Sequence, residues 1–143
     1  HRLSSAASDV YKRQGGIMTA HIYFINIDKE IATFSKFWLQ DILRNKIGFT
    51  GTIFSDDLSM KGTDYVGGIE AKVGKALESG CNMVLVCNDR PAAIEAINFL
   101  EKEEISQSHK ITKLKAFQSI SWADLEKDAR RKDIIGKLKT IEK

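Results

Sequence analysis

The 143-residue sequence has only two cysteines, one proline and no apolar run of about 20 residues. The cysteines, Cys81 and Cys87, flank one apolar segment, and in an extended strand they would lie about 20 Å apart. That separation excludes a disulfide between them. No apolar core of about 7–15 residues follows the basic residues near the start, so no secretory signal is expected. These absences predict a reduced, cytoplasmic protein without a membrane partner.

A strong net charge is also lacking. The formal net charge is +3, and the first 14 residues supply +2 of it, because Arg2, Lys12 and Arg13 stand against Asp9 alone. The remaining chain is nearly neutral, which offers nothing that would attract nucleic acid or an anionic membrane. Lysine and arginine are dense in the C-terminal third, but they alternate with aspartate and glutamate, as on a solvated helix face.

The first residues, HRLSSAASDVYKRQ, differ in character from the rest. They contain no initiator methionine and no apolar periodicity, and residues 9–14 resemble the translation of a transposon mosaic end used in sequencing libraries. We therefore expect residues 1–14 to be a sequencing or cloning artefact and exclude them from the fold prediction. The polar stretch 101–110 joins two further parts, a main unit over 15–104 and a helical extension over 105–143.

From residue 17 onward, strands and helices alternate. Short apolar runs predict strands, whereas apolar residues at helical spacing predict helices. The predicted strands are 17–24, 52–55 and 82–87, and the predicted helices are 34–45, 69–79 and 91–100. Three consecutive strand and helix units predict an α/β fold with a parallel sheet. Both a doubly wound sheet and a slice of a (β/α)8 barrel satisfy this pattern, and the period alone does not separate them.

Local signals mark several boundaries. Thr33 or Ser35 can cap the first helix, Gly80 ends the second, and Pro91 suits the first turn of the third. The third strand is almost wholly apolar, which predicts that it is covered on both faces. A capping-box-like start at Ser121 predicts one C-terminal helix, with apolar residues at Trp122, Leu125, Ala129, Ile134, Ile135 and Leu138.

Two carboxylates stand where the second strand meets solvent. The apolar run 52–54 leads directly into residues 55–60, SDDLSM. A carboxylate at such a strand end is rigidly held and yet reachable, as a nucleophile, a metal ligand or a phosphoacceptor must be. Asp56 and Asp57 are therefore the candidate site residues.

The segment 48–60, GFTGTIFSDDLSM, resembles the nucleophile segment of bacterial family 3 glycoside hydrolases, specifically the cytoplasmic β-N-acetylglucosaminidases of cell-wall recycling. Three further segments resemble the same family in the same order, namely 18–21 (MTAH), 34–40 (FSKFWLQ) and 79–88 (SGCNMVLVCN). The resemblance covers about residues 15–100. It implies a (β/α)8 TIM barrel, of which the chain would hold the last three strand and helix units, followed by the C-terminal helical extension.

The resemblance also implies a chemistry and its residues. The family removes a terminal, non-reducing N-acetylglucosamine linked β-1,4 to anhydro-muramic acid, with or without its peptide, and retains the anomeric configuration. Asp56 matches the catalytic nucleophile, while Met18 and His21 match positions that line the substrate pocket. Asp57 matches a variable position and is expected to be a turn or capping group. No metal and no organic cofactor is implied.

One functional element of the family has no match here. The family's general acid/base is an Asp-His pair on a loop after the fifth barrel strand, and the sequence contains neither that pair nor the Lys-His-Phe-Pro-Gly-like stretch before it. We therefore expect the chain to be a truncated C-terminal part of the enzyme, inactive on its own. Two alternatives are a doubly wound phosphotransfer or signalling domain, in which Asp56 and Asp57 hold Mg²⁺, and a sugar-binding remnant without catalysis.

Overall fold

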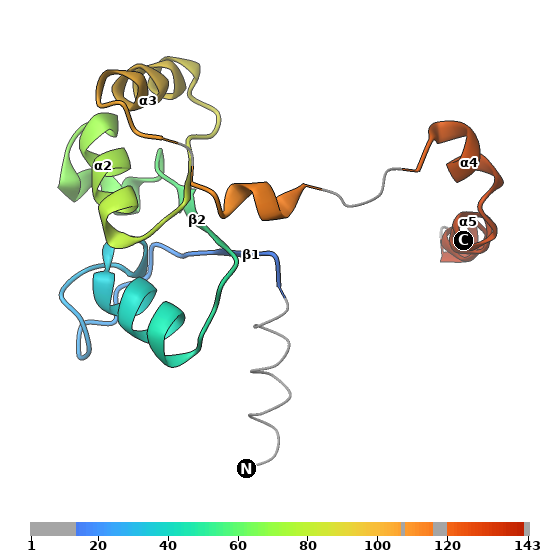
Figure 1. Ribbon diagram of the computed structural model, residues 1–143, viewed down its shortest axis with the longest axis horizontal. Coiled ribbons are helices and arrows are strands. Elements are labelled where there is room, and N and C mark those ends of the chain that lie inside the picture. Colours follow the sequence, from blue (N-terminus) through green and yellow to red (C-terminus); the bar gives the residue numbers. More distant parts are fainter. Residues whose placement is uncertain (1–13, 107, 116–119, 142–143) are drawn as a thin grey trace, which may run out of the picture.

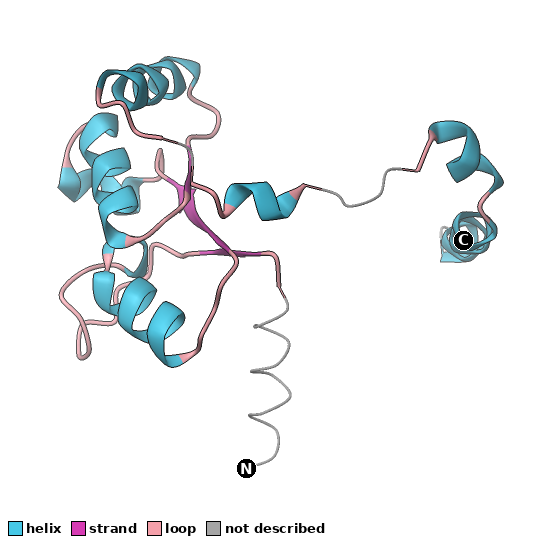
Figure 2. Cartoon of the chain, in the orientation of Figure 1, coloured by secondary structure: helices cyan, strands magenta, loops and turns pink. Residues whose placement is uncertain are grey.

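The computed structural model of the protein describes residues 14–106, 108–115 and 120–141. Its centre is a parallel sheet in which the strand order is the order along the chain: β1 (Gly16–Met18), β2 (Thr52–Asp57) and β3 (Met83–Leu85). Three longer helices lie together on one side of it (Figures 1 and 2): η2 (Phe37–Lys46), α2 (Ile69–Ser79) and α3 (Arg90–Lys102). This arrangement confirms the predicted α/β class with parallel strands. Residues 1–13 of the predicted artefact lie outside the described residues.

The core lies between β2 and these helices. Side chains alternate between the two faces of a strand, and Ile53 and Ser55 of β2 are both fully buried on the helix side. Val73 and Ala76 of α2 are fully buried as well and belong to the same apolar cluster as Ile53. Burial of each large aliphatic side chain contributes roughly 1.5–3 kcal/mol, so this contact fixes β2 against α2.

The opposite face of β2 is more open. Alternation places Phe54 and Asp56 on this face, where both are half-buried. Among the described residues, the 3₁₀ turn η4 (Ile111–Leu114) contacts β2 and lies beside the start of the strand. The Thr52 hydroxyl next to this turn donates to the Lys110 carbonyl at 2.9 Å. The carboxyl end of β2, where Asp56 lies, therefore stays accessible.

Arg44 fixes the entrance to β2. Its guanidinium donates to the carbonyls of Phe49 and Gly51, at 2.8 and 2.7 Å, and to Asn82 Oδ1 at 2.7 Å. The same Asn82 oxygen accepts from the Ile53 N–H at 3.0 Å. One planar cation thus joins η2, the segment before β2 and the start of β3, which is the use to which the fork geometry of arginine is suited.

The first strand is shorter than the predicted strand 17–24. Its last bond to β2 runs from the Thr19 N–H to the Phe54 carbonyl, at 2.9 Å. Beyond it the chain leaves the sheet and pairs with itself, because Tyr23 forms an antiparallel bridge with Ile31. The apolar residues that suggested a strand are instead about half exposed in this loop: Ile22, Tyr23 and Phe24. The prediction for this part of the segment was wrong, since local pairing replaces the sheet.

The first helix also begins later than predicted. A 3₁₀ turn, η1 (Ala32–Phe34), precedes η2, which is a π-helix. Ser35 does cap the helix, because its Oγ accepts from the Trp38 N–H at 3.0 Å. Thr33 does not, because its hydroxyl is bonded to two side chains that follow β1.

The third strand is less covered than its apolar sequence predicts. Met83 is 38% exposed, while Val84 and Leu85 are half-buried. The prediction of burial on both faces was wrong, because the described residues pack mainly against the face that contacts α2. Cys81 and Cys87 on either side of the strand are free thiols. Burial raises the pKa of Cys81 to about 12, so this thiol stays protonated.

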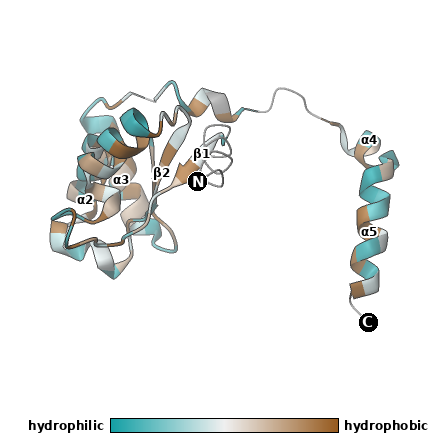
Figure 3. Cartoon of the chain, turned by 90° about the horizontal axis from the view of Figure 1, so that it is seen from below, coloured by the Kyte–Doolittle hydropathy of each residue, from teal (hydrophilic) through white to brown (hydrophobic). Residues whose placement is uncertain are grey.

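The C-terminal part forms two helices instead of the single one predicted: α4 (Trp122–Lys127) and α5 (Ala129–Ile141). The Ser121 cap is confirmed, since its Oγ accepts from the Asp124 N–H at 3.2 Å. The break falls at Asp128, whose carboxylate accepts from the Arg131 N–H at 2.7 Å and so starts a new helix. Figures 1 and 3 both show α4 and α5 apart from the sheet, and Trp122 is 79% exposed.

Both α3 and α5 have 13 residues. Within the described ranges, no helix has the length and hydropathy that a membrane span requires.

Gly80 provides a test of the link between α2 and β3. Its φ is +123°, and a Cβ there would lie 2.0 Å from Gln40 Nε2. We expect Gly80→Ala to lower the free energy of unfolding by about 1–3 kcal/mol, because the side chain strains the backbone and displaces Gln40. Urea unfolding followed by the fluorescence of the half-buried Trp38 measures this. The matched control, Gly136→Ala in the open surroundings of α5, should leave that transition unchanged.

Candidate active site

The two carboxylates identified in the sequence lie at the carboxyl end of the middle strand. Asp56 is half-buried, and its Oδ1 accepts a hydrogen bond from the Asp57 N–H at 2.8 Å. Its Oδ2 makes no hydrogen bond to any of the described residues. One carboxylate oxygen is therefore held by the backbone, which orients the group, while the other remains available to a substrate.

Asp57, next to Asp56, stabilises the loops around the site. Its carboxylate accepts from the Ser59 N–H and hydroxyl, at 2.9 and 2.8 Å, and from the Cys87 N–H at 3.0 Å. These bonds close the turn after β2 and join it to the loop after β3. The expected turn or capping group is confirmed.

The charge of Asp57 is stabilised by the same contacts. Burial alone would raise the pKa of its carboxyl group, but the hydrogen bonds from Cys87 and Ser59 and the nearby His21 outweigh it and lower the pKa below the usual value. The group is therefore ionised throughout the neutral range, as a hydrogen-bond acceptor for three donors should be.

His21 follows β1 and lies against the same turn. Its Nε2 donates to the Asp57 carbonyl at 2.9 Å, and its Nδ1 is 2.9 Å from Thr33 Oγ1. Both ring nitrogens are therefore engaged with protein groups. The structure places His21 next to the Asp56–Asp57 pair, and the predicted contact with a sugar remains a prediction.

Met18 ends β1 on the open face of the sheet. It pairs in register with Phe54, which puts its side chain on the face that Asp56 shares, and it is 57% exposed. The three predicted site residues Met18, His21 and Asp56 thus gather at one end of the sheet. That Met18 lines a substrate pocket remains a prediction.

Sequence reasoning missed the residues that support this end of the sheet. The sequence suggested Thr33 as a possible helix cap and Cys87 as the end of a strand, and it suggested no separate role for Ser59. Lys72 was hidden in a helical pattern, yet its Nζ is buried and donates to the Leu58 carbonyl at 3.2 Å and to Asp64 at 2.7 Å. A lysine on the buried face of an amphipathic helix was the one signal that could have drawn attention to it.

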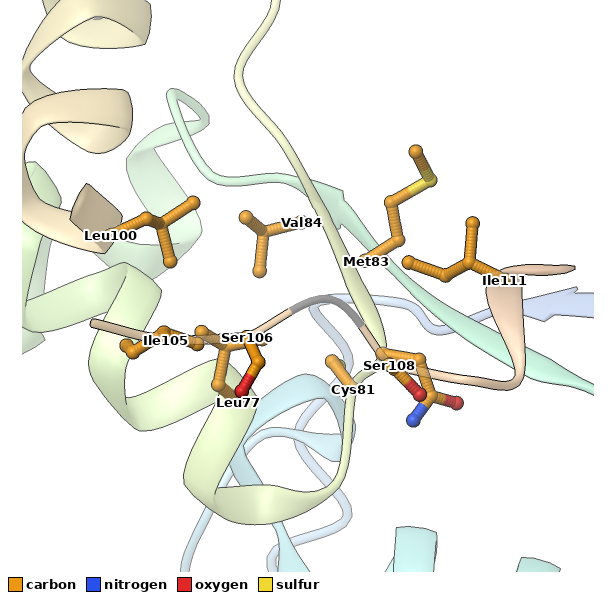
Figure 4. Close-up of a pocket in the computed structure, with 10 residues that line it drawn as sticks. Leu77, Cys81, Met83, Val84, Leu100, Ile105, Ser106, Ser108 and Ile111 are labelled. Carbon is orange, nitrogen blue, oxygen red and sulfur yellow. The ribbon is translucent and has the colours of Figure 1, made fainter. Parts of the chain in front are cut away.

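An apolar pocket lies at the other end of β3 and is separate from these carboxylates (Figure 4). Leu77, Val84, Leu100 and Ile105 surround it, between α2, α3 and the segment that follows α3. Its polar lining groups are Asn82, Ser106 and Ser108, and no carboxylate, histidine, lysine or arginine is among the described residues that line it. The candidate chemistry therefore belongs to the carboxyl end of β2.

Comparison with known proteins shows which family the chain resembles. Residues 5–116 match the glycosyl hydrolase family 3 N terminal domain. The chain belongs to this family. The match confirms the family resemblance drawn from the four sequence segments, and it disfavours the phosphotransfer alternative. The geometry agrees, since both oxygens of the Asp57 carboxylate accept from protein donors.

Among curated proteins, the chain is similar to two enzymes named β-hexosaminidase. It is 39% identical to that of Mannheimia succiniciproducens over 119 residues, which are 80% of this chain and 34% of that protein. It is 42% identical to that of Idiomarina loihiensis over 117 residues, 80% of this chain and 36% of that protein. The chain thus spans about one third of the length of the curated relatives it matches.

The chain is also similar to solved structures of two related enzymes. The β-N-acetylglucosaminidase from Thermotoga maritima matches with a TM-score of 0.59 and 31% identity, over 75% of this chain and 25% of that one. NagZ from Neisseria gonorrhoeae matches with a TM-score of 0.57 and 34% identity, over 73% of this chain and 28% of that one. The parallel sheet and its helices therefore match part of the fold of these two enzymes.

The low pKa of Asp57 makes the turn sensitive to acid. Because the pKa of the folded state lies below the unfolded value of about 3.9, the ionised group stabilises the fold above that value. This stabilisation is lost as the pH falls through the folded-state pKa. Carbon-detected NMR titration of the Asp57 carboxyl group should give a midpoint below about 3.9.

Urea unfolding at neutral pH and near pH 3 supplies the matching stability measurement. Asp57→Asn should remove the part of the pH dependence that belongs to this group. A midpoint at or above the unfolded value, or an unchanged pH dependence in the variant, would contradict the expected stabilisation.

Proposed function

We propose that these residues supply the nucleophile, Asp56, of a retaining β-N-acetylglucosaminidase. The substrate is a terminal, non-reducing N-acetylglucosamine linked to anhydro-muramic acid, with or without its peptide, and the setting is cell-wall recycling in the cytoplasm. The observation that carries the proposal is the position of Asp56, a half-buried carboxylate at the end of the middle strand with one oxygen held and one free.

The chemistry follows from that position. The free oxygen, Oδ2, attacks the anomeric carbon of the sugar, and the glycosidic bond breaks as an acid donates a proton to the leaving oxygen. Water then attacks the anomeric carbon of the covalent glycosyl ester, loses a proton to the same acid/base group and releases the Asp56 carboxylate. The bond from the Asp57 N–H to Oδ1 keeps the carboxylate in one orientation through both steps.

The substrate class is supported by what the relatives are called. Relatives of known sequence are named β-hexosaminidases, and one solved NagZ from Neisseria gonorrhoeae, 34% identical, is a complex with N-trifluoroacetyl-D-glucosamine. An N-acylated glucosamine of this kind fits the proposed substrate. Met18 and His21 would line the pocket beside the sugar, and the reaction calls for no metal or organic cofactor.

The place of the chain in the whole enzyme is also part of the proposal. Residues 15–104 would form the last three units of a (β/α)8 barrel, and residues 105–143 a helical extension. The open sheet face, with Met18 and Met83 partly exposed, would then face the barrel interior. The acid/base group and most of the sugar pocket would come from the remainder of a protein of the relatives' length.

The role of Asp56 is tested in a chimera in which residues 15–104 replace the matching segment of the gonococcal NagZ. Asp56→Ala should lower kcat by roughly 10⁴–10⁶-fold, as loss of a covalent nucleophile or its activating partner does in other hydrolases. Hydrolysis of a chromogenic β-N-acetylglucosaminide measures this. Asp41→Asn, an exposed carboxylate on η2, is the matched control and should leave kcat unchanged.

Trapping of the intermediate makes the test specific. A slow fluorinated glucosaminide should label the active chimera, and peptide mass spectrometry should place the label on Asp56. A label on another residue, or an Asp56→Ala chimera of full activity, would rule out the proposed nucleophile.

The 143-residue chain alone should show no hydrolysis above the background rate. It holds a nucleophile, but a missing general acid costs about 10²–10⁴-fold on that step alone, and most of the sugar contacts would be missing too. The same chromogenic assay, with the chimera as positive control, checks this. Robust turnover by the isolated chain would mean that its own residues provide the acid.

A further inference from the structure

The peptide group between Asp57 and Leu58, which follows the proposed nucleophile Asp56, is hydrogen-bonded at both its C=O and its N–H. The Asp57 carbonyl accepts from His21 Nε2 at 2.9 Å, from the β1 side of the sheet. The N–H of the same peptide, on Leu58, donates to the Leu85 carbonyl of β3 at 2.8 Å. The Asp57 N–H, one peptide earlier, holds Asp56 Oδ1. The orientation of the nucleophile therefore depends on a backbone that His21 and β3 clamp from opposite sides.

The hydrogen bond to a carbonyl determines which nitrogen of His21 carries the proton. A carbonyl only accepts, so Nε2 must bear the hydrogen, and in the neutral ring Nδ1 is then an acceptor. The Thr33 hydroxyl, 2.9 Å away, is the group that donates to it. Having used its proton in this way, Thr33 accepts from the Thr19 hydroxyl at 3.0 Å. The three side chains form a directed chain that ends at the Asp57 carbonyl.

Thr33 is well placed to act as the fixed end of this chain. Its side chain is fully buried, and Thr19 is only 9% exposed, so water does not compete for either hydroxyl. The turn η1 that carries Thr33 is tied to its neighbours on both sides. The Ala32 N–H donates to the Ile22 carbonyl at 2.9 Å, and the Ser79 hydroxyl at the end of α2 donates to the Phe34 carbonyl at 2.7 Å.

We propose that Thr33, supported by Thr19, is a positioning residue for the nucleophile. The Asp57 carbonyl selects the Nε2–H form of His21. Thr33 donates to Nδ1 of that form and so sets the plane of the ring, and His21 in turn fixes the Asp57 carbonyl and the backbone that holds Asp56. This inference rests on the proposed function of Asp56. It assigns the two nitrogens of His21 to the protein framework, so that a sugar beside His21 would meet the ring and not a free N–H.

The first test concerns the His21 ring itself and needs no activity. Long-range ¹H–¹⁵N NMR of the full 143-residue chain at neutral pH should show His21 with the proton on Nε2. Thr33→Val, which keeps the shape and removes the hydroxyl, should change the ¹⁵N shift of Nδ1, and Thr33→Ser should restore it. A wild-type ring with its proton on Nδ1 would overturn the proposal without any variant, and so would a Nδ1 shift that Thr33→Val leaves unchanged.

The second test separates positioning from folding by kinetics in the chimera described above. Thr33→Val should lower kcat by about 10- to 100-fold, because a misplaced reacting group costs rate, while KM changes little. Thr33→Ser should recover most of kcat. A Thr33→Val chimera with wild-type kcat, or a loss that Thr33→Ser does not recover, would overturn the proposal.

The two proposals can fail separately. If Asp56→Ala keeps full activity, the proposed nucleophile is wrong whatever His21 does. If Asp56→Ala is inactive and Thr33→Val keeps its activity, the proposed nucleophile is supported and the proposed positioning role of Thr33 is wrong. If Thr33→Val does not fold, the position of the His21 proton in the wild-type NMR measurement decides the question.

Discussion

The fold and the candidate site both depend on the hydrogen bonds made by a single residue, Asp57. Its N–H orients Asp56, and its carbonyl accepts a hydrogen bond from His21 on the β1 side. Its carboxylate accepts from Ser59 in the same turn and from the Cys87 N–H on the β3 side. Backbone and side chain therefore connect three neighbouring loops at one point. An ionised acceptor suits this position because hydrogen bonds to a charged group are stronger than those between neutral groups.

The two ends of β2 are organised on the same principle with opposite charges. At the amino end, the guanidinium of Arg44 donates to two carbonyl oxygens of the segment before β2 and to the Asn82 amide oxygen before β3. At the carboxyl end, the Asp57 carboxylate accepts from N–H and O–H groups of the loops. Between them, Ile53 and Ser55 are fully buried. The strand is thus held at each end by an ion and in the middle by apolar packing, which leaves Asp56 little freedom to move.

Much of this could be predicted from the sequence, for reasons that individual residues make clear. Apolar runs and helical spacing located all three strands and the helices beside them, and Gly80 and Ser35 acted at the predicted helix boundaries. The strand end with Asp56 was recognisable because an apolar run stops at two carboxylates. The predicted length of the first strand was wrong. The segment from Ile22 to Phe24 has the composition of a strand, but it pairs with residues 31 and 32. The composition of a segment does not predict which other segment it pairs with.

The side chains that support the site could not be predicted from the sequence, for a different reason. Thr33 is 12 residues from His21, and Cys87 is 30 residues from Asp57, so their contacts exist only once the sheet has formed. A threonine before a helix has a local explanation as a cap, and nothing in one sequence favours the distant partner over the local one. The burial of β3 was overestimated because an apolar strand signals a covering layer without saying which residues provide it.

The order of the strands has a consequence for how the chain acquires its structure. Because β1, β2 and β3 lie side by side in the order in which they are synthesised, each new strand meets a neighbour that has already left the ribosome. The helix that joins two strands can settle on them at once, so each loop closure spans only one unit. Among the described residues, assembly can therefore proceed stepwise from β1, and the junction of β2 with β3, where the Cys87 N–H meets the Asp57 carboxylate, follows the junction of β1 with β2.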